Sequence, residues 1–263
     1  MKVGNNNSIL NQTIAQQDNL FKKLASARRI NSAADDAAGL QIANQLTSGI
    51  NAREQAVRNV YDGVSLARVY DQGLQAIEEN LQDLNTLAIQ AGNGIYGASE
   101  RQALQQQADQ LLGNIQQVID NTEFAGKGLF NQSGDVTFGT GDSSLSLSTE
   151  DVAAVLTTSN LFDFDLTDPS QLSASLGSVE QSLQQLGGLR ADTGATINAF
   201  EAAASVIDRQ RIGESEARSR IEDLDFAKAV SDQVVGNILL QSSISVAAQG
   251  RVQQEQALRI LGG

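Results

Sequence analysis

Two long stretches of this chain place mainly apolar residues at alternating intervals of three and four positions, and this pattern limits the possible folds more than any other feature. Such intervals put side chains on one face of an α-helix, and a stripe sustained over several heptads is typical of helices packed along their length. The first stripe comprises Ala56, Val60, Gly63, Ala67, Tyr70, Leu74, Ile77, Leu81, Leu84, Ala88 and Ala91. The second comprises Leu172, Leu176, Val179, Leu183, Leu186, Arg190, Thr193, Ile197, Phe200, Ala204 and Ile207.

Shorter patterns predict two more helices. Leu10, Ile14, Phe21 and Leu24, with Gln17 in the remaining stripe position, predict an amphipathic helix near the start of the chain. After the glycine-rich segment AGNGIYGAS ends the first long helix, a capping-box pattern at Ser99 and Gln102 opens the next one. Its apolar stripe comprises Leu104, Leu111, Ile115 and Val118.

Residues 131–168 follow a different pattern. The segments VTFG and SLSLS alternate with the strand period around the turn-forming TGDS, and this predicts a small hairpin. STEDVAAVL has room for one or two helical turns, and FDFDL has the pattern of a further short strand. Asp168 followed by Pro169 predicts the cap and first residue of the next helix.

These patterns together predict a mainly α fold: a long antiparallel helical bundle or coiled coil with paired terminal helices and a small β-hairpin region. We expect five segments. Residues 1–30 form an N-terminal helix, 31–130 and 169–225 form the two parts of a helical layer, 131–168 form the hairpin region, and 226–263 form a C-terminal helix.

The residue types present argue against an enzyme. The chain has no His, Cys or Trp, so imidazole bases, thiolate nucleophiles and most zinc, copper or haem sites are excluded. It also has no P-loop, EF-hand loop or dinucleotide-binding fingerprint. We expect no catalytic residues, no cofactor and no metal, although a hard cation held by carboxylates alone stays open.

Two adjacent acids, Asp35 and Asp36, are the most suggestive chemical feature. Paired carboxylates suit acid–base catalysis or half a metal site, but they also suit the start of a helix. Here they follow Asn31 and Ser32, either of which can cap a helix, and acids in a first turn stabilise the positive end of the helix dipole. We therefore predict a helix start, with ion pairs to the nearby arginines, Arg28 and Arg29.

Charge is distributed unevenly along the chain, whose net charge is −13. Residues 1–30 carry +4, residues 120–170 carry −8 and residues 226–263 carry +1. An acidic middle argues against binding to nucleic acid, which needs a basic face. No apolar run reaches membrane-spanning length, so we expect no membrane partner, and no hydrophobic signal-peptide stretch follows Met1.

The terminal helices carry too few apolar residues to be stable alone, since short isolated helices are marginal in water. We expect them to pair with each other and then with neighbouring copies of the chain, so that folding of the ends is coupled to assembly. The predicted assembly interface comprises Leu10, Ile14, Phe21, Leu24, Val235, Ile238, Leu239, Val246 and Val252.

Several of these segments closely resemble bacterial flagellin. RINSAADDAAGLQIANQL and ARSRIEDLDFAKAVSDQVVGNILLQSSISVAAQ occupy the matching ends of the chain. VRNVYDGVSLARVYDQGLQAIEENLQDLNTLAIQAGNG and ASVIDRQRIGESEARSRIED extend the resemblance to nearly everything except the acidic middle. The large outer domains usual in this family have no room between residues 131 and 168, so the chain resembles a short flagellin.

The resemblance implies a structural subunit that self-assembles into the extracellular flagellar filament for motility. Residues 1–30 and 226–263 are then filament-core helices, and the family also implies an export chaperone and a filament cap as partners. Two alternatives stay open. A hook–filament junction protein shares both terminal designs but occurs in far fewer copies, and a soluble coiled-coil scaffold explains the heptads but forms no long filaments.

The segment LQDLNTLAIQ resembles the flagellin region recognised by a vertebrate Toll-like receptor. Gln82, Asp83 and Leu87 are the candidate receptor-facing residues. The stimulatory form has Arg at the position of Asp83, and reversing this charge penalises binding, so we do not expect receptor activation.

Serine and threonine side chains are frequent between residues 143 and 159, in the segment expected on the exterior. In this family such residues can carry O-linked sugars, whereas in most proteins they are ordinary loop residues. The candidates for O-glycosylation are Ser143, Ser144, Ser146, Ser148, Thr157, Thr158 and Ser159.

Overall fold

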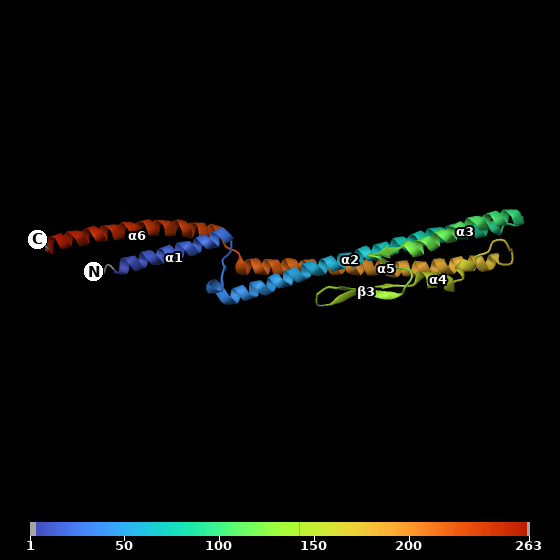
Figure 1. The fold of residues 1–263 in the computed structure, drawn as a ribbon, viewed down its shortest axis with the longest axis horizontal. Coiled ribbons are helices and arrows are strands. Elements are labelled where there is room, and N and C mark those ends of the chain that lie inside the picture. Colours follow the sequence, from blue (N-terminus) through green and yellow to red (C-terminus); the bar gives the residue numbers. More distant parts are fainter. Residues whose placement is uncertain (1–3, 142, 262–263) are drawn as a thin grey trace. The chain divides into compact units, whose positions relative to one another are not determined.

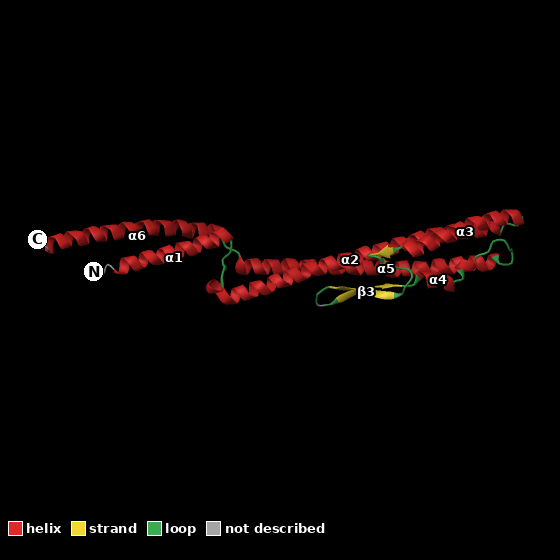
Figure 2. Cartoon of the chain, in the orientation of Figure 1, coloured by secondary structure: helices red, strands yellow, loops and turns green. Residues whose placement is uncertain are grey.

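The computed structural model describes residues 4–141 and 143–261. They form two compact units, one from residues 52–210 and the other from the first 51 residues together with those from 211 onward. Helices α2 (Ala33–Ala91) and α5 (Leu172–Glu222) each extend through both units. Figures 1 and 2 show that helices dominate the described chain, as predicted.

The unit formed by residues 52–210 is a helical bundle. Its long elements are α2, α3 (Ala98–Asn121) and α5, and α3 returns alongside α2 (Figure 1). Helices α2 and α5 are antiparallel, because Arg68 pairs with Glu201 whereas Glu78, further along α2, pairs with the earlier residue Arg190. This confirms the antiparallel bundle.

The predicted stripe of α2 forms the centre of this unit. Every position of that stripe from Ala56 to Ala91 is buried, including Gly63 and Tyr70. The stripe of α5 contributes a buried set and a half-buried set. The buried set comprises Val179, Leu186, Thr193, Phe200, Ala204 and Ile207, and the half-buried set comprises Leu172, Leu176, Leu183, Arg190 and Ile197.

Along the chain, two small antiparallel sheets and two short helices follow α3 and precede α5. Strand β1 (Glu123–Phe124) pairs with β2 (Lys127–Gly128), and β3 (Gly134–Gly139) pairs with β4 (Ser144–Thr149) in the predicted hairpin (Figure 2). In that hairpin Val136 lies opposite Leu147. Helix α4 (Val152–Thr158) and the 3₁₀ helix η1 (Leu161–Asp163) follow.

Two predicted helix starts differ from the structure. Helix α3 has Gly97 as its N-cap residue with no side-chain capping bond, so the capping box at Ser99 and Gln102 is not formed. Asp168 accepts a hydrogen bond from the Ser170 N–H at 2.9 Å, but this bond closes a turn, and α5 begins only at Leu172.

The predicted strand in FDFDL is also wrong, because its first two residues belong to the 3₁₀ helix Leu161–Asp163 and the others pair with no described strand. Phe162 is 39% exposed, whereas the other apolar residues of this segment turn inward to the bundle. Leu161, Phe164 and Leu166 are all buried in the core.

In the other unit, α1 (Gly4–Ser26) and α6 (Phe226–Leu261) lie against each other (Figure 1). The chain leaves this pair through two short segments that run next to each other. We call residues 27–32 and 223–225 the neck, since they connect the pair to α2 and α5.

Candidate assembly interface

Helices α1 and α6 contact each other along a seam spaced by threes and fours. On α1 the partly buried positions among the side chains described from Leu10 onward are, besides Lys23, Leu10, Thr13, Gln17, Leu20 and Leu24. On α6 the partly or fully buried positions among the described side chains are Ala229, Gln233, Gly236, Leu240, Ser243, Ala247 and Gly250. The α6 seam is thus a heptad pattern built mainly from small and polar residues, which hydrophobicity alone does not reveal.

Gly236 and Gln17 mark the closest approach in this seam. A β-carbon added at Gly236 would lie 2.8 Å from Nε2 of Gln17, so the glutamine side chain occupies the space that the glycine leaves free. Nε2 of Gln17 is buried without a hydrogen-bond partner among the described residues. The contact between the two helices therefore contributes little apolar burial at its centre.

Most of the large apolar side chains of the pair lie outside the seam. Phe21 is 63% exposed and Ile14 is 42% exposed, whereas Leu10 and Leu24 are half-buried in the seam. On α6 the predicted residues are all more than half exposed: Val235, Ile238, Leu239, Val246 and Val252. The predicted interface therefore divides into two seam residues and seven residues that face solvent in the single chain.

Sequence reasoning missed part of this exposed apolar surface. Phe226, Val230, Val234 and Ile244 are also exposed on α6. Each residue turns a helix by about 100°, so Val234 lies on a different side of α6 from Val235 and from Leu239, which follows Val235 by about one turn. Helix α6 is thus apolar around much of its circumference, a pattern typical of helices that are buried on all sides.

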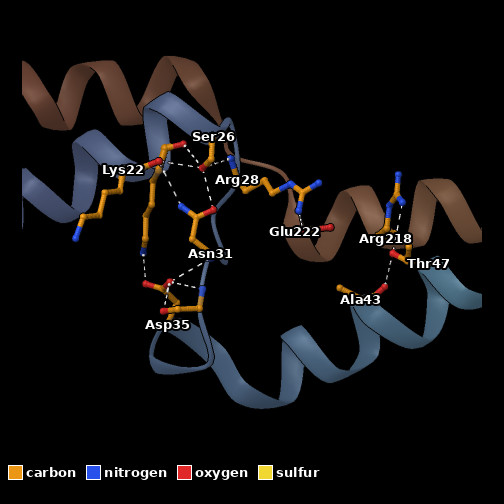
Figure 3. A network of polar contacts seen from close by, with 11 residues as sticks. Lys22, Ser26, Arg28, Asn31, Asp35, Ala43, Thr47, Arg218 and Glu222 are labelled. Atoms are coloured by element: carbon orange, nitrogen blue, oxygen red, sulfur yellow. Dashed lines mark hydrogen bonds and ion pairs between the residues drawn. The ribbon is translucent and has the colours of Figure 1, made fainter.

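Asp35 organises the first segment of the neck (Figure 3). Its Oδ2 accepts hydrogen bonds from the N–H groups of Asn31 and Ser32 and from the Ser32 hydroxyl, all at 3.0–3.1 Å. Lys23 Nζ lies 3.3 Å from Oδ1. The backbone bond from Asn31, followed by the hydroxyl of Ser32, holds the pKa of Asp35 below its ordinary value.

Asp36 is the capping residue of the long helix. It has extended backbone angles (φ −164°, ψ 100°), and its Oδ1 accepts a hydrogen bond from the Gly39 N–H at 2.8 Å. Asp36 therefore caps the part of α2 that follows the kink these angles produce, whereas the side chains of Asn31 and Ser32 bond to Ser26, Lys22 and Asp35. Both acids lie in the first turn of α2, and Asp35 pairs with a lysine and not with an arginine.

The two arginines instead join the two neck segments. Arg28 makes an ion pair of 2.7 Å with Glu222, and an isolated β-bridge links Arg28 to Asp223. Arg29 donates one hydrogen bond from its N–H to the Glu222 carbonyl at 2.7 Å and another from its guanidinium to the Ile221 carbonyl at 2.6 Å. Segments almost two hundred residues apart in sequence thus hold each other through backbone bonds.

The same unit has a second polar link beyond the neck. The Arg218 guanidinium donates to the Thr47 hydroxyl at 3.4 Å, and Thr47 donates to the Ala43 carbonyl one turn earlier in α2 (Figure 3). Together with the neck bonds, this link ties the start of α2 to the end of α5.

The structure places the candidate receptor-facing residues on α2. Gln82 and Asp83 are exposed, and Leu87 is half-exposed. Their neighbours Leu81 and Leu84 are buried in the bundle core.

Six of the seven O-glycosylation candidates are exposed: Ser143, Ser144, Ser146 and Ser148 in or beside β4, and Thr157 and Thr158 in α4. Ser159 differs from them because it is only 2% exposed. Its hydroxyl donates to the Leu156 carbonyl and lies 2.6 Å from the hydroxyl of Ser182, which is itself fully buried. Ser159 is therefore inaccessible in the folded chain and is removed from the candidates.

No helix among the described residues combines the length and apolar character needed to span a bilayer. Within the same residues, no three acidic side chains come together as a set of metal ligands.

Comparison with known proteins adds sequence relatives at both ends. Residues 1–135 match the model of the bacterial flagellin N-terminal helical region, and residues 166–261 match that of the bacterial flagellin C-terminal helical region. A flagellin from Halalkalibacterium halodurans is 31% identical over 252 residues, which are 94% of this chain and 92% of the relative.

Two solved structures are similar in fold. The crystal structure of Bacillus cereus flagellin has a TM-score of 0.51 and 24% identity, over 57% of this chain and 88% of that chain. A Vibrio parahaemolyticus chain described as a flagellar hook-associated protein has a TM-score of 0.65 and 12% identity, over 72% of this chain and 100% of that chain. At such identities the likeness concerns the fold alone.

Proposed function

Since this chain belongs to the bacterial flagellin family and is a structural subunit of the flagellar filament, we propose that copies of it polymerise through the apolar surface of α1 and α6. One observation carries the proposal. Seven of the nine apolar residues predicted to form the assembly interface face solvent in the single chain, and most of them lie on one helix.

The physical reason is the free energy of burial. A Val, Ile or Leu side chain transferred from water to an apolar contact contributes roughly 1.5–3 kcal/mol. The seam between α1 and α6 contains four leucines, but Gln17, Gly236 and its remaining positions are small or polar, so it leaves part of this contribution unused. Neighbouring copies that cover Val235, Ile238 and Leu239 supply it, and they offset the ordering entropy of the terminal helices.

In this proposal the neck holds the end of α1 next to the start of α6. The ion pair between Arg28 and Glu222 and the backbone bond from Arg29 to Glu222 keep both helices adjacent where they leave the rest of the unit. Both helices then present their apolar surfaces to neighbouring copies together.

Family membership also suggests partners and a location for the chain. The filament is extracellular, and we propose export without a cleaved signal peptide, an export chaperone that covers the exposed face of α6 before assembly, and a filament cap at the growing end. We do not propose activation of the innate immune receptor, because Asp83 is an exposed acid where the stimulatory family members carry Arg.

A deletion and a matched pair of substitutions test the proposal. Removing residues 226–263 should leave a helical chain that forms no filaments. Ile238→Ser changes an exposed apolar residue, whereas Leu240→Ser makes the same chemical change in the seam. Ile238→Ser should reduce polymerisation while the helicity and unfolding of the single chain stay unchanged. Leu240→Ser should alter the unfolding of the single chain as well as polymerisation.

Circular dichroism, sedimentation and electron microscopy after salt-induced polymerisation provide the measurements. Filaments of normal length from the deleted chain would overturn the proposal. So would an Ile238→Ser chain that polymerises as the wild type does, because a 58% exposed residue in the interface must lose contacts when its apolar side chain is shortened.

A further inference from the structure

The loop between α2 and α3 contains Asn93–Gly94, which is the one Asn-Gly dipeptide in the sequence. We infer that this dipeptide is a site of spontaneous chemical modification, in which the backbone nitrogen of Gly94 attacks the side-chain amide carbon of Asn93. The inference concerns loop chemistry at the end of α2, and it is independent of the polymerisation surface proposed above.

The reaction needs only water as a co-reactant. A bond forms between the Gly94 nitrogen and Cγ of Asn93, the bond from Cγ to the side-chain nitrogen breaks, and ammonia leaves with the proton that the Gly94 nitrogen gives up. Water then opens the five-membered imide at either carbonyl, which leaves aspartate or isoaspartate at position 93. Nothing is oxidised or reduced.

The attacking nitrogen of Gly94 is accessible. Residues 93 and 94 are both exposed, and a β-carbon built on Gly94 would meet nothing within 4 Å. The Gly94 N–H donates none of the hydrogen bonds found among the described residues. A glycine also lacks the β-carbon that would hinder the approach of its nitrogen to a neighbouring side chain.

The side chain that is attacked is already folded back over this peptide. The Ile95 N–H donates to Oδ1 of Asn93 at 3.3 Å, so the side chain curves across the intervening peptide group. The same oxygen gains negative charge when the nitrogen adds to Cγ, and an N–H donor placed on it stabilises that charge. The loop backbone is held in this shape because the Tyr96 N–H donates to the Asn93 carbonyl at 3.0 Å.

Asn31, another exposed asparagine followed by a small residue, shows the opposite arrangement. Its side-chain nitrogen donates to the Lys22 carbonyl at 3.4 Å, and its Oδ1 accepts from the Ser26 hydroxyl at 2.8 Å. The backbone nitrogen that would attack, that of Ser32, donates its proton to Asp35 at 3.0 Å. The leaving group and the nucleophile are both held in hydrogen bonds, so Asn31 serves as an internal reference.

Modification at Asn93 changes the charge of the loop. The neutral amide becomes a carboxylate two residues after α2 ends at Ala91, and the net charge of −13 becomes one unit more negative. A negative charge beside the C-terminal end of a helix is unfavourable because that end carries partial negative charge. The modified chain is therefore separable from the original by charge and has a less stable end of α2.

The test follows the full-length chain, kept unpolymerised, through incubation in neutral and mildly alkaline buffer. Proteolysis and tandem mass spectrometry localise the mass increase that replacement of an amide nitrogen by oxygen produces. We expect this increase at Asn93, faster at the higher pH because the attacking nitrogen must lose its proton, and none at Asn31. Labelling by isoaspartyl methyltransferase identifies the isoaspartate product, and isoelectric focusing shows the new acidic band.

Gly94→Ala is the decisive variant, because the open space around residue 94 and its backbone angle both accommodate a β-carbon. Its circular dichroism should match the wild type, and the acidic band should be lost. Asn93→Asp provides the reference peptide and the reference band. Equal rates at Asn93 and Asn31, or an unchanged rate in Gly94→Ala, would overturn the inference without bearing on polymerisation.

Discussion

A β-carbon added at Gly63 would lie 2.4 Å from Cε2 of Phe200, so the phenyl ring of α5 fills the space that the glycine leaves on α2. The same ring meets Phe138 of the hairpin edge-on, with ring centroids 5.7 Å apart. Phe200 is 1% exposed and thus joins α2, α5 and the β3–β4 hairpin in one contact. Glycine inside a helix lowers stability by roughly 0.5–1 kcal/mol relative to alanine. The close packing of the Phe200 ring explains why residue 63 is nevertheless a glycine.

Gly63→Ala should therefore destabilise the chain by ~1–3 kcal/mol, the usual cost of overpacking, despite the better helix propensity of alanine. Gly194→Ala in α5 is the matched control, because a β-carbon there meets nothing within 4 Å. This control should stabilise the chain by up to ~1 kcal/mol. Urea unfolding of both variants measures the difference, and equal stabilities would show that the ring yields without cost.

Phe200→Ala should cost about 3–5 kcal/mol, because it removes a fully buried ring and leaves a cavity between three elements. Tyr61→Ala removes an aromatic ring that is 56% exposed on the neighbouring helix, and its effect should stay within about 0.5 kcal/mol. Thermal unfolding of the unpolymerised chain compares the two variants. An unchanged midpoint for Phe200→Ala would contradict the packing described here.

Arg190 is a charged member of the apolar stripe of α5. Its Nε lies 3.0 Å from Asp71 and its Nη1 lies 2.5 Å from Glu78, and the hydrogen bonds to these carboxylates, Asp71 first, raise its pKa further above the ordinary value. Arg190→Lys loses the two-pronged geometry, and we expect a cost of about 1 kcal/mol that shrinks in high salt.

Arg58→Lys provides the comparison for Arg190→Lys. The Arg58 side chain is 56% exposed and pairs with Glu54 on the same helix. Exposed pairs of this kind contribute roughly 0.3–0.5 kcal/mol, so this variant should be close to neutral. Chemical unfolding at low and high ionic strength measures the loss of stability in each variant. Equal losses for Arg190→Lys and Arg58→Lys would mean that the ion pairs between α2 and α5 stabilise the chain no more than an exposed pair does.

Asp35 should make the neck sensitive to acid. Its pKa is lowered in the folded chain, so its carboxylate contributes stability above the pKa of the unfolded chain, and this contribution is lost as the pH falls through the lower folded value. Amide proton shifts of Asn31 and Ser32, the two backbone donors to Asp35, should titrate at a pH below the ordinary pKa of an aspartate. In Asp35→Asn this titration should be absent, and its persistence would assign it to another acid.

Much of the helical architecture was predictable because helical periodicity is a local property. Eleven stripe positions from Ala56 to Ala91 are all buried, since residues three and four apart share a face whatever lies opposite. Turn residues and alternating strand residues likewise marked the hairpin, and their pairing confirms it. The FDFDL segment was not predictable in this way, because a short apolar run suits a strand and an irregular core segment equally well.

The sequence by itself determined which segments form the long helices, which faces of those helices are apolar and which family the resemblance indicates. Only the tertiary structure decided that Leu24 lies in the seam whereas Phe21 is exposed. It also decided that Ser159 is buried against Ser182 and that Arg28 pairs with Glu222. Each of these depends on a partner distant in sequence. Period and propensity describe how a segment is arranged around its own axis, whereas the position of a second segment follows from the packing and hydrogen bonding of the whole chain.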